Sequence, residues 1–474
     1  MPDPPVAQTG DPPEPAGPTG VTSVTSAKAT RGADSRGEPK RSQASHATPP
    51  QVSGGARRRG GVRRTGDARR ASGSQPVVLD GSDLSELFEV GRAAGLDLVG
   101  ATRAAAWGHT RTQLERRRNL GLNADMAFTY KNPPRSTDAT RVVKGAATLI
   151  VGARSYLQTD DAPPDPSIEV AAQVARYATA DHYGQLAASL ERVAEALRAR
   201  GARAVVVLDR NDIVDREAAW RCGIGWYGKN SLLLAPGFGS WIVLGSVVTN
   251  ARLNPDTAPV PTPVGDHCGT CRRCVDACPT GAIVADGVID AGRCLSWLLQ
   301  ACGSFPVEHR VALGDRIYGC DDCQTACPPN RAVELRARRL ESSDDVGSGP
   351  HRSIASPGRW MDAMELLNLD DEALLDRVGR WYIADRNPDL VRRNLLIVIA
   401  NSAPADNASV RSVLEQFDSG ADPMLSEHAT WALNRLDDRI GSTIGSTIGA
   451  GSGTTTDQTT TMESDPPPAT TRAP

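Results

Sequence analysis

The chain has 474 residues and a mass of 50.1 kDa, which is too long for one ordinary hydrophobic core and predicts two or three domains. Only 39% of the residues are hydrophobic, and 45 Gly and 34 Pro are present, so part of the chain is expected not to fold. No apolar run approaches the ~20 residues of a membrane span, and no secretory signal pattern opens the chain. The net charge of −3 argues against nonspecific nucleic-acid binding but leaves room for a local basic patch.

Composition divides the chain into five segments. Residues 1–76 and 439–474 are rich in Gly, Pro, Ser and Thr, so we expect two disordered tails that bury too little apolar surface to fold. The first tail is basic, which suits a solvated tail or weak RNA association. Residues 77–258 are expected to form an α/β or α+β domain, residues 259–340 a cysteine-bearing domain, and residues 341–438 a helical domain.

Apolar spacing in the first domain alternates between the helical and the strand period. A helix over residues 84–94 is expected to begin at an N-cap of Ser82 or Asp83. The other elements expected there are a strand over 96–101, a helix around 113–120, a buried strand over 147–153, a helix over 183–200 and buried strands over 204–208 and 241–248. The order of these strands in a sheet does not follow from the sequence.

The helical domain shows short amphipathic segments with little strand signal. They cover residues 361–367, 371–378, 390–401, 410–417 and 423–436. Consecutive pairs of such helices predict about one and a half to two repeat units of the HEAT kind.

Nine of the ten cysteines lie between Cys268 and Cys327, which indicates a metal site in a reducing compartment rather than a disulfide scaffold. The tenth, Cys222, lies beside glycines and is expected to have a packing role. Cys268, Cys271, Cys274 and Cys278, which precedes a proline, have the bacterial ferredoxin spacing. In that geometry three thiolates hold one [4Fe–4S] cube and the fourth reaches a second cube, whereas zinc sites pair two Cys-x2-Cys knuckles. The pattern therefore predicts two [4Fe–4S] clusters and a one-electron relay.

A second run, Cys320, Cys323 and Cys327, lacks its first cysteine, whose place Ile317 occupies. The first cluster is expected to bind Cys268, Cys271, Cys274 and Cys327. The second is expected to bind Cys278, Cys320, Cys323 and one cysteine of the insert, where the candidates are Cys294 and Cys302. Cys294 is favoured, which leaves Cys302 as a free thiol.

No dinucleotide fingerprint, c-type haem motif or His-x3-His spacing is present, so the relay needs another organic or metal cofactor at its end. Acid chemistry is expected where the strand over 204–208 ends, because Asp209, Asp212 and Asp215 follow it. A partly desolvated carboxyl there would keep its proton near neutral pH and act as a general acid. A helix N-cap or a salt bridge to Arg216 is the simpler role for any one of the three.

Several motifs, in order from about Leu84 to Leu436, resemble the epoxyqueuosine reductase family. They are Arg176-Tyr-Ala, Asp181-His-Tyr183, Asp209 with Asp215-Arg216, Gly223-Ile-Gly-Trp-Tyr-Gly-Lys-Asn230, Gly239-Ser-Trp241, Leu244-Gly245, Asp266-His-Cys-Gly-Thr-Cys271, Arg316-Ile-Tyr-Gly-Cys-Asp-Asp-Cys-Gln324 and Val391-Arg-Arg-Asn394. Asp212 departs from the family, which usually has proline there.

The resemblance implies a nitroreductase-like cobalamin domain, a ferredoxin-like two-cluster domain and a HEAT-like domain that helps to hold tRNA. It places the proton donor on Asp209 and the last cluster ligand on Cys294. The positions that it assigns to cobalamin are Arg135, Arg176, Asp209, Lys229, Leu233 and Leu244. Of these, Lys229 is expected to contact either the cofactor or the substrate. The basic residues expected to meet tRNA phosphates are Arg336, Arg338, Arg339, Arg392 and Arg393.

We therefore expect a cytoplasmic, monomeric oxidoreductase that reduces epoxyqueuosine in tRNA with cobalamin and electrons from an external one-electron donor. Two alternatives stay open: a cobalamin and iron–sulfur reductase of another small substrate, resembling reductive dehalogenases, and a non-catalytic electron-transfer or RNA-binding iron–sulfur protein. The helical domain argues against the first, since a small-molecule reductase does not need it. Asp209 and the large α+β domain argue against the second, since a ferredoxin needs neither.

Overall fold

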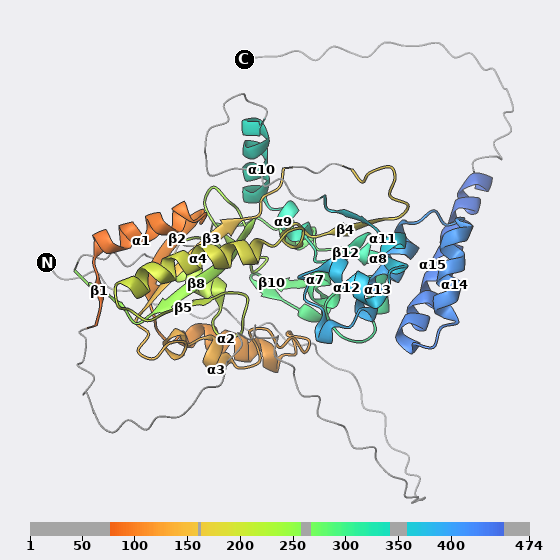
Figure 1. Cartoon of the computed structure of the whole chain (residues 1–474). Coiled ribbons are helices and arrows are strands. Elements are labelled where there is room, and N and C mark those ends of the chain that lie inside the picture. Colours follow the sequence, from red (N-terminus) through yellow and green to blue (C-terminus); the bar gives the residue numbers. More distant parts are fainter. Residues whose placement is uncertain (1–75, 160–162, 257–266, 342–357, 450–474) are drawn as a thin grey trace, which may run out of the picture. The chain divides into compact units, whose positions relative to one another are not determined.

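The structure, a computed structural model, describes residues 76–159, 163–256, 267–341 and 358–449 (Figure 1). The expected N-terminal tail, apart from its last residue, and the end of the C-terminal tail lie outside these residues. No helix in the described ranges is both long and apolar enough to cross a membrane.

A four-stranded antiparallel sheet forms the centre of the N-terminal part. Its order is β2 (Leu98–Arg103), β3 (Thr148–Ser155), β8 (Ile242–Thr249) and β5 (Ala204–Val207). Every residue of β8 is buried because helices cover both faces of the sheet. α1 (Gly81–Ala93) and α4 (His182–Ala199) pack on one face (Figure 1). α5 (Asp215–Arg221) packs on the other face. Cys222 is buried in the α5 layer, in agreement with its expected packing role.

Helix α1 begins earlier than expected. Its N-cap is Asp80, whose carboxylate accepts the N–H groups of Ser82 and Asp83, while Asp83 accepts the N–H of Asp80. The prediction of Ser82 or Asp83 as the cap was therefore wrong, because a reciprocal capping box forms further upstream.

A second sheet joins three distant stretches of the chain. In it, β4 (Ala171–Val174) lies between β12 (Arg316–Tyr318), which is parallel to it, and β13 (Trp360–Asp362), which is antiparallel. One hydrophobic core runs from Val170 through Ile317 to Leu396. This core therefore contains residues from both sides of the domain borders expected near residues 258 and 340. The borders mark changes in composition, not separate cores.

The C-terminal part is helical. Its members are α11 (Ala363–Leu367), α12 (Asp371–Val378), α13 (Asp389–Ser402), α14 (Ala408–Asp418) and α15 (Pro423–Gly449), with η4 (Ala384–Arg386) before α13. α15 packs along both α13 and α14 through a buried stripe that includes Leu425, Ala432 and Leu436.

Residues 439–449 are helical, so the prediction of a disordered tail from residue 439 was wrong for this stretch. Extending a helix that packing has already nucleated costs little per residue, even for a Gly- and Ser-containing sequence.

Smaller elements complete the described chain. They are β1 (Val78–Leu79) paired with β9 (Arg252–Leu253), β6 (Trp226–Tyr227) with β7 (Leu233–Leu234), β10 (Ile283–Ala285) with β11 (Val288–Ile289), α2 (Gly108–Asn119), α3 (Pro133–Ser136), α6 (Arg273–Asp276), α7 (Leu295–Leu298), α8 (Val307–Leu313), α9 (Asp322–Thr325), α10 (Pro328–Glu341), η1 (Ala139–Arg141), η2 (Arg176–Ala178) and η3 (Ala291–Arg293). One face of α10 enters the same core as α4, through Val333 and Ala337.

Candidate iron–sulfur and proton-transfer site

The first group of thiols gathers at the start of the cysteine segment. Cys274 interacts electrostatically with Cys268 and Cys271, and Cys327 interacts with all three. Burial raises the pKa of the Cys327 thiol to about 11, with further contributions from the neighbouring thiols. The structure thus brings together the four cysteines expected for the first cluster, although Cys327 lies far along the chain.

The second group contains the remaining expected ligands. Cys323 interacts with Cys320, Cys294 and Cys278, and burial raises the pKa of Cys320 to about 12. Cys323 also interacts with Cys274, so the two groups adjoin. Cys302 instead is exposed and its thiol lies near Arg393. The structure places Cys294, not Cys302, in the second group.

Local backbone geometry delivers the second run of cysteines. Gly319, directly before Cys320, has φ +72°, and a Cβ there would lie 2.5 Å from the Cβ of Ala175. Only glycine accepts both this conformation and this close approach. The next residue, Cys320, can therefore follow β12 while that strand stays paired to β4.

The donor set fits two four-iron clusters. Each group offers four thiols, and thiolate sulfur is the ligand that iron–sulfur clusters use. The raised thiol pKa values favour protonated sulfur until a metal displaces the proton, so cluster binding and thiol ionisation are coupled. Among the residues that the structure describes, no three His, Cys, Asp or Glu side chains converge on a single-ion site; thiolates around a cube stand farther apart than thiolates around one ion.

Asp209 follows β5 with φ +49°, in the left-handed region that is unfavourable for a residue with a side chain. The residue is exposed to solvent, yet protein atoms around its carboxyl displace water and raise its pKa, while Arg380 acts in the opposite direction. Such strain at a strand end is typical of functional sites. Asp209 therefore combines exposure to solvent with a carboxyl that holds its proton more firmly than usual.

The other two strand-end carboxyls have different surroundings. Asp212, the residue that departs from the family pattern, forms an ion pair with Arg135 at 2.5 Å. It therefore has the salt-bridge role considered in the sequence analysis, but its partner is Arg135 and not Arg216. Asp215 opens α5, and burial, then the charge of Asp209, raises its pKa well above the ordinary value. Its Oδ1 atom has no hydrogen-bond partner within the described part of the chain.

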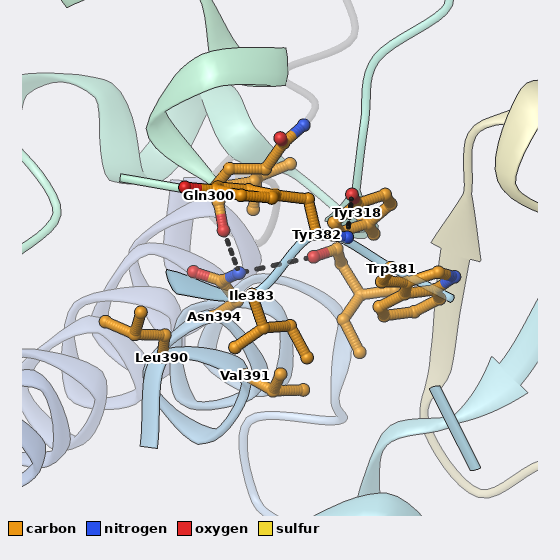
Figure 2. A pocket seen from close by; sticks show the side chains of 10 residues that line it. Gln300, Tyr318, Trp381, Tyr382, Ile383, Leu390, Val391 and Asn394 are labelled. Atoms are coloured by element: carbon orange, nitrogen blue, oxygen red, sulfur yellow. Dashed lines mark hydrogen bonds between the residues drawn. The ribbon is translucent and has the colours of Figure 1, made fainter. Parts of the chain in front are cut away.

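Tyrosines from separate elements surround these carboxyls, and sequence reasoning missed their role. Tyr183 of α4 interacts with Asp209 and Asp215, and Tyr318 of β12 also interacts with Asp209. Figure 2 shows Tyr318 against Trp381, with ring centroids 4.5 Å apart and planes at 12°. The available signal was the position of both tyrosines inside the motifs Asp-His-Tyr183 and Arg-Ile-Tyr318.

Arg216 links the acid site to the second thiol group. Its guanidinium is exposed and interacts with Asp215, Tyr183 and Cys294. The charge of Arg216 therefore acts on both the strand-end carboxyls and the second group of thiols.

Of the residues assigned to cobalamin, Arg135 and Lys229 both form ion pairs, and the Lys229 side chain is only 11% exposed. Arg135 is exposed beside Asp212, and Lys229 pairs with Asp286 at 3.1 Å. An apolar pocket of about 280 Å³ lies close to the Lys229 segment; its lining residues are Trp226, Ala235, Pro236, Gly237, Gly239, Pro329, Ala332, Val333 and Arg336.

The side chains of three other assigned residues are already engaged. Arg176 is 1% exposed and pairs with Glu334. Leu233 of β7 and Leu244 of β8 are buried in the core that these strands share with α5. Packing and ion pairing leave these side chains little free surface, so a ligand at these positions would be bordered mainly by the backbone. The assignment of these three positions to cobalamin stays a prediction.

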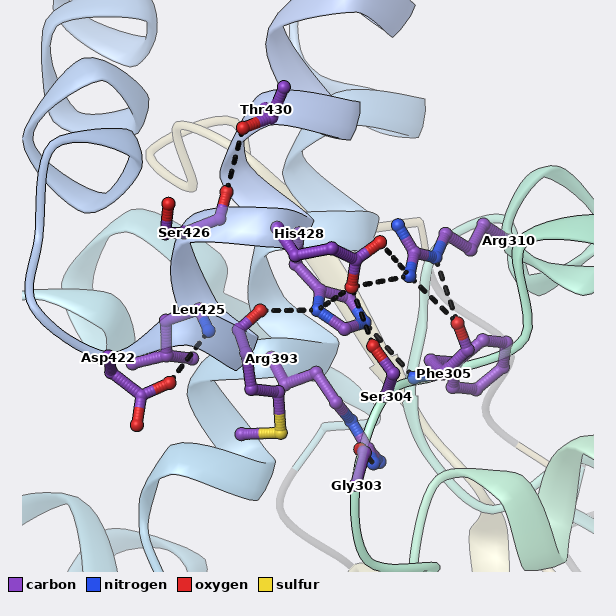
Figure 3. Close-up of polar contacts among 12 residues, drawn as sticks. Gly303, Ser304, Phe305, Arg310, Arg393, Asp422, Leu425, Ser426, His428 and Thr430 are labelled. Carbon is purple, nitrogen blue, oxygen red and sulfur yellow. Dashed lines mark hydrogen bonds and ion pairs between the residues drawn. The ribbon is translucent and has the colours of Figure 1, made fainter. Parts of the chain in front are cut away.

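Some of the basic residues expected to bind RNA are exposed, and the others are buried and already paired. Arg336, Arg338 and Arg339 are exposed on α10. Arg393 is fully buried and donates to the carbonyl oxygens of Ala301, Gly303 and Leu298; Figure 3 shows it beside Gly303. Arg392 is 12% exposed and paired with Asp371 and Asp389. The prediction that Arg392 and Arg393 meet phosphates was wrong, because these guanidinium groups tie α13 to its neighbours.

Two adjoining groups of four thiols beside a strand-end acid define an iron–sulfur oxidoreductase. The model of a 4Fe-4S double cluster binding domain matches residues 267–330. Epoxyqueuosine reductase of Bacillus subtilis is 27% identical over 358 residues, which is 74% of this chain and 87% of the relative. Epoxyqueuosine reductase of Xanthomonas campestris is 30% identical over 326 residues, or 66% of this chain and 85% of the relative.

Solved structures agree with the sequence relatives. An epoxyqueuosine reductase with a tRNA-Tyr epoxyqueuosine-modified stem loop matches with a TM-score of 0.64 and 27% identity over 74% of this chain and 90% of that one. The enzyme of Streptococcus thermophilus matches with a TM-score of 0.63 and 26% identity over the same shares. The chain belongs to the epoxyqueuosine reductase family.

Proposed function

We propose that the protein reduces epoxyqueuosine to queuosine at the wobble position of tRNA. The observation that carries this proposal is the adjacency of the second thiol group, through Arg216, to the carboxyls around Asp209. This arrangement lets single electrons arrive within reach of a group that can supply a proton. Reduction of the epoxide consumes two electrons and two protons, breaks both carbon–oxygen bonds, and yields an alkene and water.

The cofactors of this reaction are two [4Fe–4S] clusters and cobalamin. Cys268, Cys271, Cys274 and Cys327 would hold one cluster, and Cys278, Cys294, Cys320 and Cys323 the other. Among the assigned residues, Arg135 offers an exposed side chain for cobalamin and Lys229 one that is 11% exposed, and the apolar pocket beside Trp226 would border a part of the cofactor. When bound, cobalamin supplies a cobalt centre that exchanges electrons one at a time and performs the reductive chemistry.

Asp209 is the proton donor in this proposal. Opening the epoxide would leave an alkoxide, and a positioned acid avoids that charge. Its carboxyl reaches solvent and substrate, and its raised pKa keeps more of it protonated near neutral pH. Asp215 raises the proton affinity of this region further, because two carboxyls that interact cannot both ionise easily.

Substrate RNA would be held by the basic face of α10 and the C-terminal helices. A base whose chemistry occurs at a buried cofactor must leave its stack, and the anticodon loop makes this inexpensive because it is single-stranded. We assign the N-terminal part to a nitroreductase-like cobalamin domain, the cysteine segment to a ferredoxin-like domain, and α11–α15 to HEAT-like helices. A cytoplasmic monomer that receives electrons from an external donor completes the proposal.

The test is reconstitution without oxygen. Protein supplied with iron, sulfide, cobalamin and a one-electron reductant is mixed with an epoxyqueuosine-containing anticodon stem loop, and the nucleosides are separated by mass. Conversion to queuosine by the parent, with little by Asp209→Asn at equal cluster and cobalamin content, supports the proposal. A fully loaded parent that leaves epoxyqueuosine unchanged would refute it.

A further inference from the structure

The loop between α12 and η4, residues 379–383, contacts Tyr318 of β12 and belongs to no motif of the sequence analysis. We call it the aromatic loop. Trp381 of this loop stacks on Tyr318, and its indole N–H donates to the carbonyl of Ala178 at 3.3 Å. Trp381 and Ile383 are buried and anchor the loop to the core shared by β4 and β12 (Figure 2).

Hydrogen bonds fix the backbone of the aromatic loop as well. The N–H of Tyr382 donates to the hydroxyl of Tyr318 at 2.8 Å. Arg386 donates to the carbonyl oxygens of Gly379 at 3.0 Å and Leu375 at 3.0 Å. The loop is therefore held in place before any ligand binds, which lowers the ordering cost of binding.

On this fixed backbone the ring of Tyr382 is turned outward. Tyr382 is 59% exposed, although Trp381 and Ile383 on either side of it are buried. An exposed ring on a rigid support gains little in the unliganded protein, since its apolar surface stays in water. Such a ring is the kind of surface on which an unstacked nucleobase packs.

The same loop brings a cation to the acid site. Arg380 forms an ion pair with Asp181, the N-cap of α4, and its charge acts on Asp209. Tyr318, which accepts the N–H of Tyr382, also interacts with Asp209. The charge of Arg380 thus acts on the carboxyl that would serve the reacting base, and the exposed ring of Tyr382 is connected to the same carboxyl through Tyr318.

We propose that the aromatic loop holds a nucleotide next to the reacting one, with Tyr382 stacked on its base and Arg380 paired with its phosphate. This proposal rests on the proposed function for its RNA ligand. A flanking base that leaves the anticodon stack would then stack on Tyr382 instead. Arg380 would exchange its present partner, the exposed carboxylate of Asp181, for a phosphate. Ring stacking on a single base is worth roughly a 5- to 150-fold change in affinity.

The test measures binding and does not depend on turnover. Cluster-loaded parent, Tyr382→Ala, Tyr382→Phe and Arg380→Gln are titrated into a fluorescent anticodon stem loop at several salt concentrations. We expect Tyr382→Ala to bind roughly 5- to 150-fold more weakly and Tyr382→Phe to restore most of the parent's affinity. Arg380→Gln should weaken binding and lower the salt slope by about 0.7, the value for one single-strand phosphate contact.

Arg377→Gln is the matched control, because Arg377 is exposed on the preceding helix α12 and its replacement removes the same charge. Equal affinity of Tyr382→Ala and the parent would overturn the proposal while leaving the proposed function intact. A Tyr382→Phe variant as weak as Tyr382→Ala would also overturn it, since the hydroxyl rather than the ring would then make the contact. A loaded parent that binds no stem loop would overturn this inference and the proposed function together.

Discussion

The guanidinium of Arg176 lies 2.6 Å from the carboxylate of Glu334, and this ion pair joins η2 of the N-terminal part to α10. The guanidinium carbon also lies 4.5 Å from the ring centroid of Trp241. Both charged side chains are almost fully buried, so neither can regain water if its partner is removed. The basic outer face of α10 therefore has a fixed relation to the core that contains α4.

Replacing Arg176 with Met should destabilise the protein by about 3–5 kcal/mol, because Glu334 would remain as an unpaired buried charge. The midpoint of urea unfolding, followed by tryptophan fluorescence, measures this change. The double variant Arg176→Met with Glu334→Leu should recover most of the stability, since it removes both charges. A double variant no more stable than Arg176→Met would show that the charge of Glu334 is not the cause.

Because Cys294 lies in the second group of thiols and Cys302 does not, replacing each of them should have a different effect on cluster content. Cys294→Ala should remove one cluster and reduce the iron content from about eight to about four atoms per chain, because each cube contains four irons. Cys302→Ala, the matched control, should keep both clusters. Iron analysis and the visible absorption bleached by dithionite check both values. Loss of a cluster in the Cys302 variant would reverse the ligand assignment.

Asp209→Asn should retain both clusters and cobalamin and lose roughly 10²–10⁴ in turnover, the usual contribution of a positioned general acid. Only the protonated carboxyl can donate, so the turnover of the parent should fall as the pH rises through the raised pKa of Asp209. Asp212→Asn, which breaks the ion pair with Arg135, is the comparison. Near-normal turnover of Asp209→Asn would move the acid to Asp215.

His428 makes the C-terminal helices sensitive to acid. Its Nε2 accepts the N–H of Phe305 at 3.1 Å and its Nδ1 donates to the carbonyl of Met424 at 2.6 Å (Figure 3). The first bond needs the neutral ring, because a protonated Nε2 cannot accept, whereas the second bond survives protonation. Burial, with the nearby charge of Arg310, lowers the pKa of His428 to about 4, below the ordinary value of 6.5. The unfolded chain therefore binds the proton more readily, and the stabilisation is complete above pH ~6.5 and lost toward pH ~4.

The free energy of unfolding should fall by at most about 1.4 kcal/mol per pH unit across this window. Urea unfolding of the parent and of His428→Gln at several pH values measures the slope. The variant keeps a hydrogen-bonding side chain without a titrating ring, so its slope should be smaller. Identical slopes would exclude His428 as the source.

Neutralising Arg336, Arg338 and Arg339 together should weaken stem-loop binding and lower its salt slope by about one unit for each phosphate that α10 no longer neutralises. The control removes three exposed arginines from α1 and α4, namely Arg92, Arg192 and Arg198. If the two triple variants bound equally well, α10 would not be the RNA surface.

The cysteine spacing and the strand-end position of Asp209 could be read from the sequence, because both are local patterns. The short interval between Cys274 and Cys278 indicates a cluster ligand set, and a buried run that ends in a carboxylate indicates a candidate acid. Neither inference depends on the order of the strands in the sheet. Most helix positions were also predictable from apolar periodicity, since the face that packs is recorded every three to four residues. The cap at Asp80 and the helical stretch 439–449 were missed because a capping box and a packed neighbour changed the ends.

Only the tertiary structure decided which residues meet. The order β2-β3-β8-β5, the sheet that joins β4 to β12 and β13, and the nearness of Arg380 to Asp209 all join residues far apart in the chain. Burial separated arginines that look alike in sequence: Arg393 donates to backbone carbonyls inside the protein, whereas Arg336 is exposed. A guanidinium reveals its charge in the sequence, but its partners, and hence its function, depend on the packing of distant segments around it.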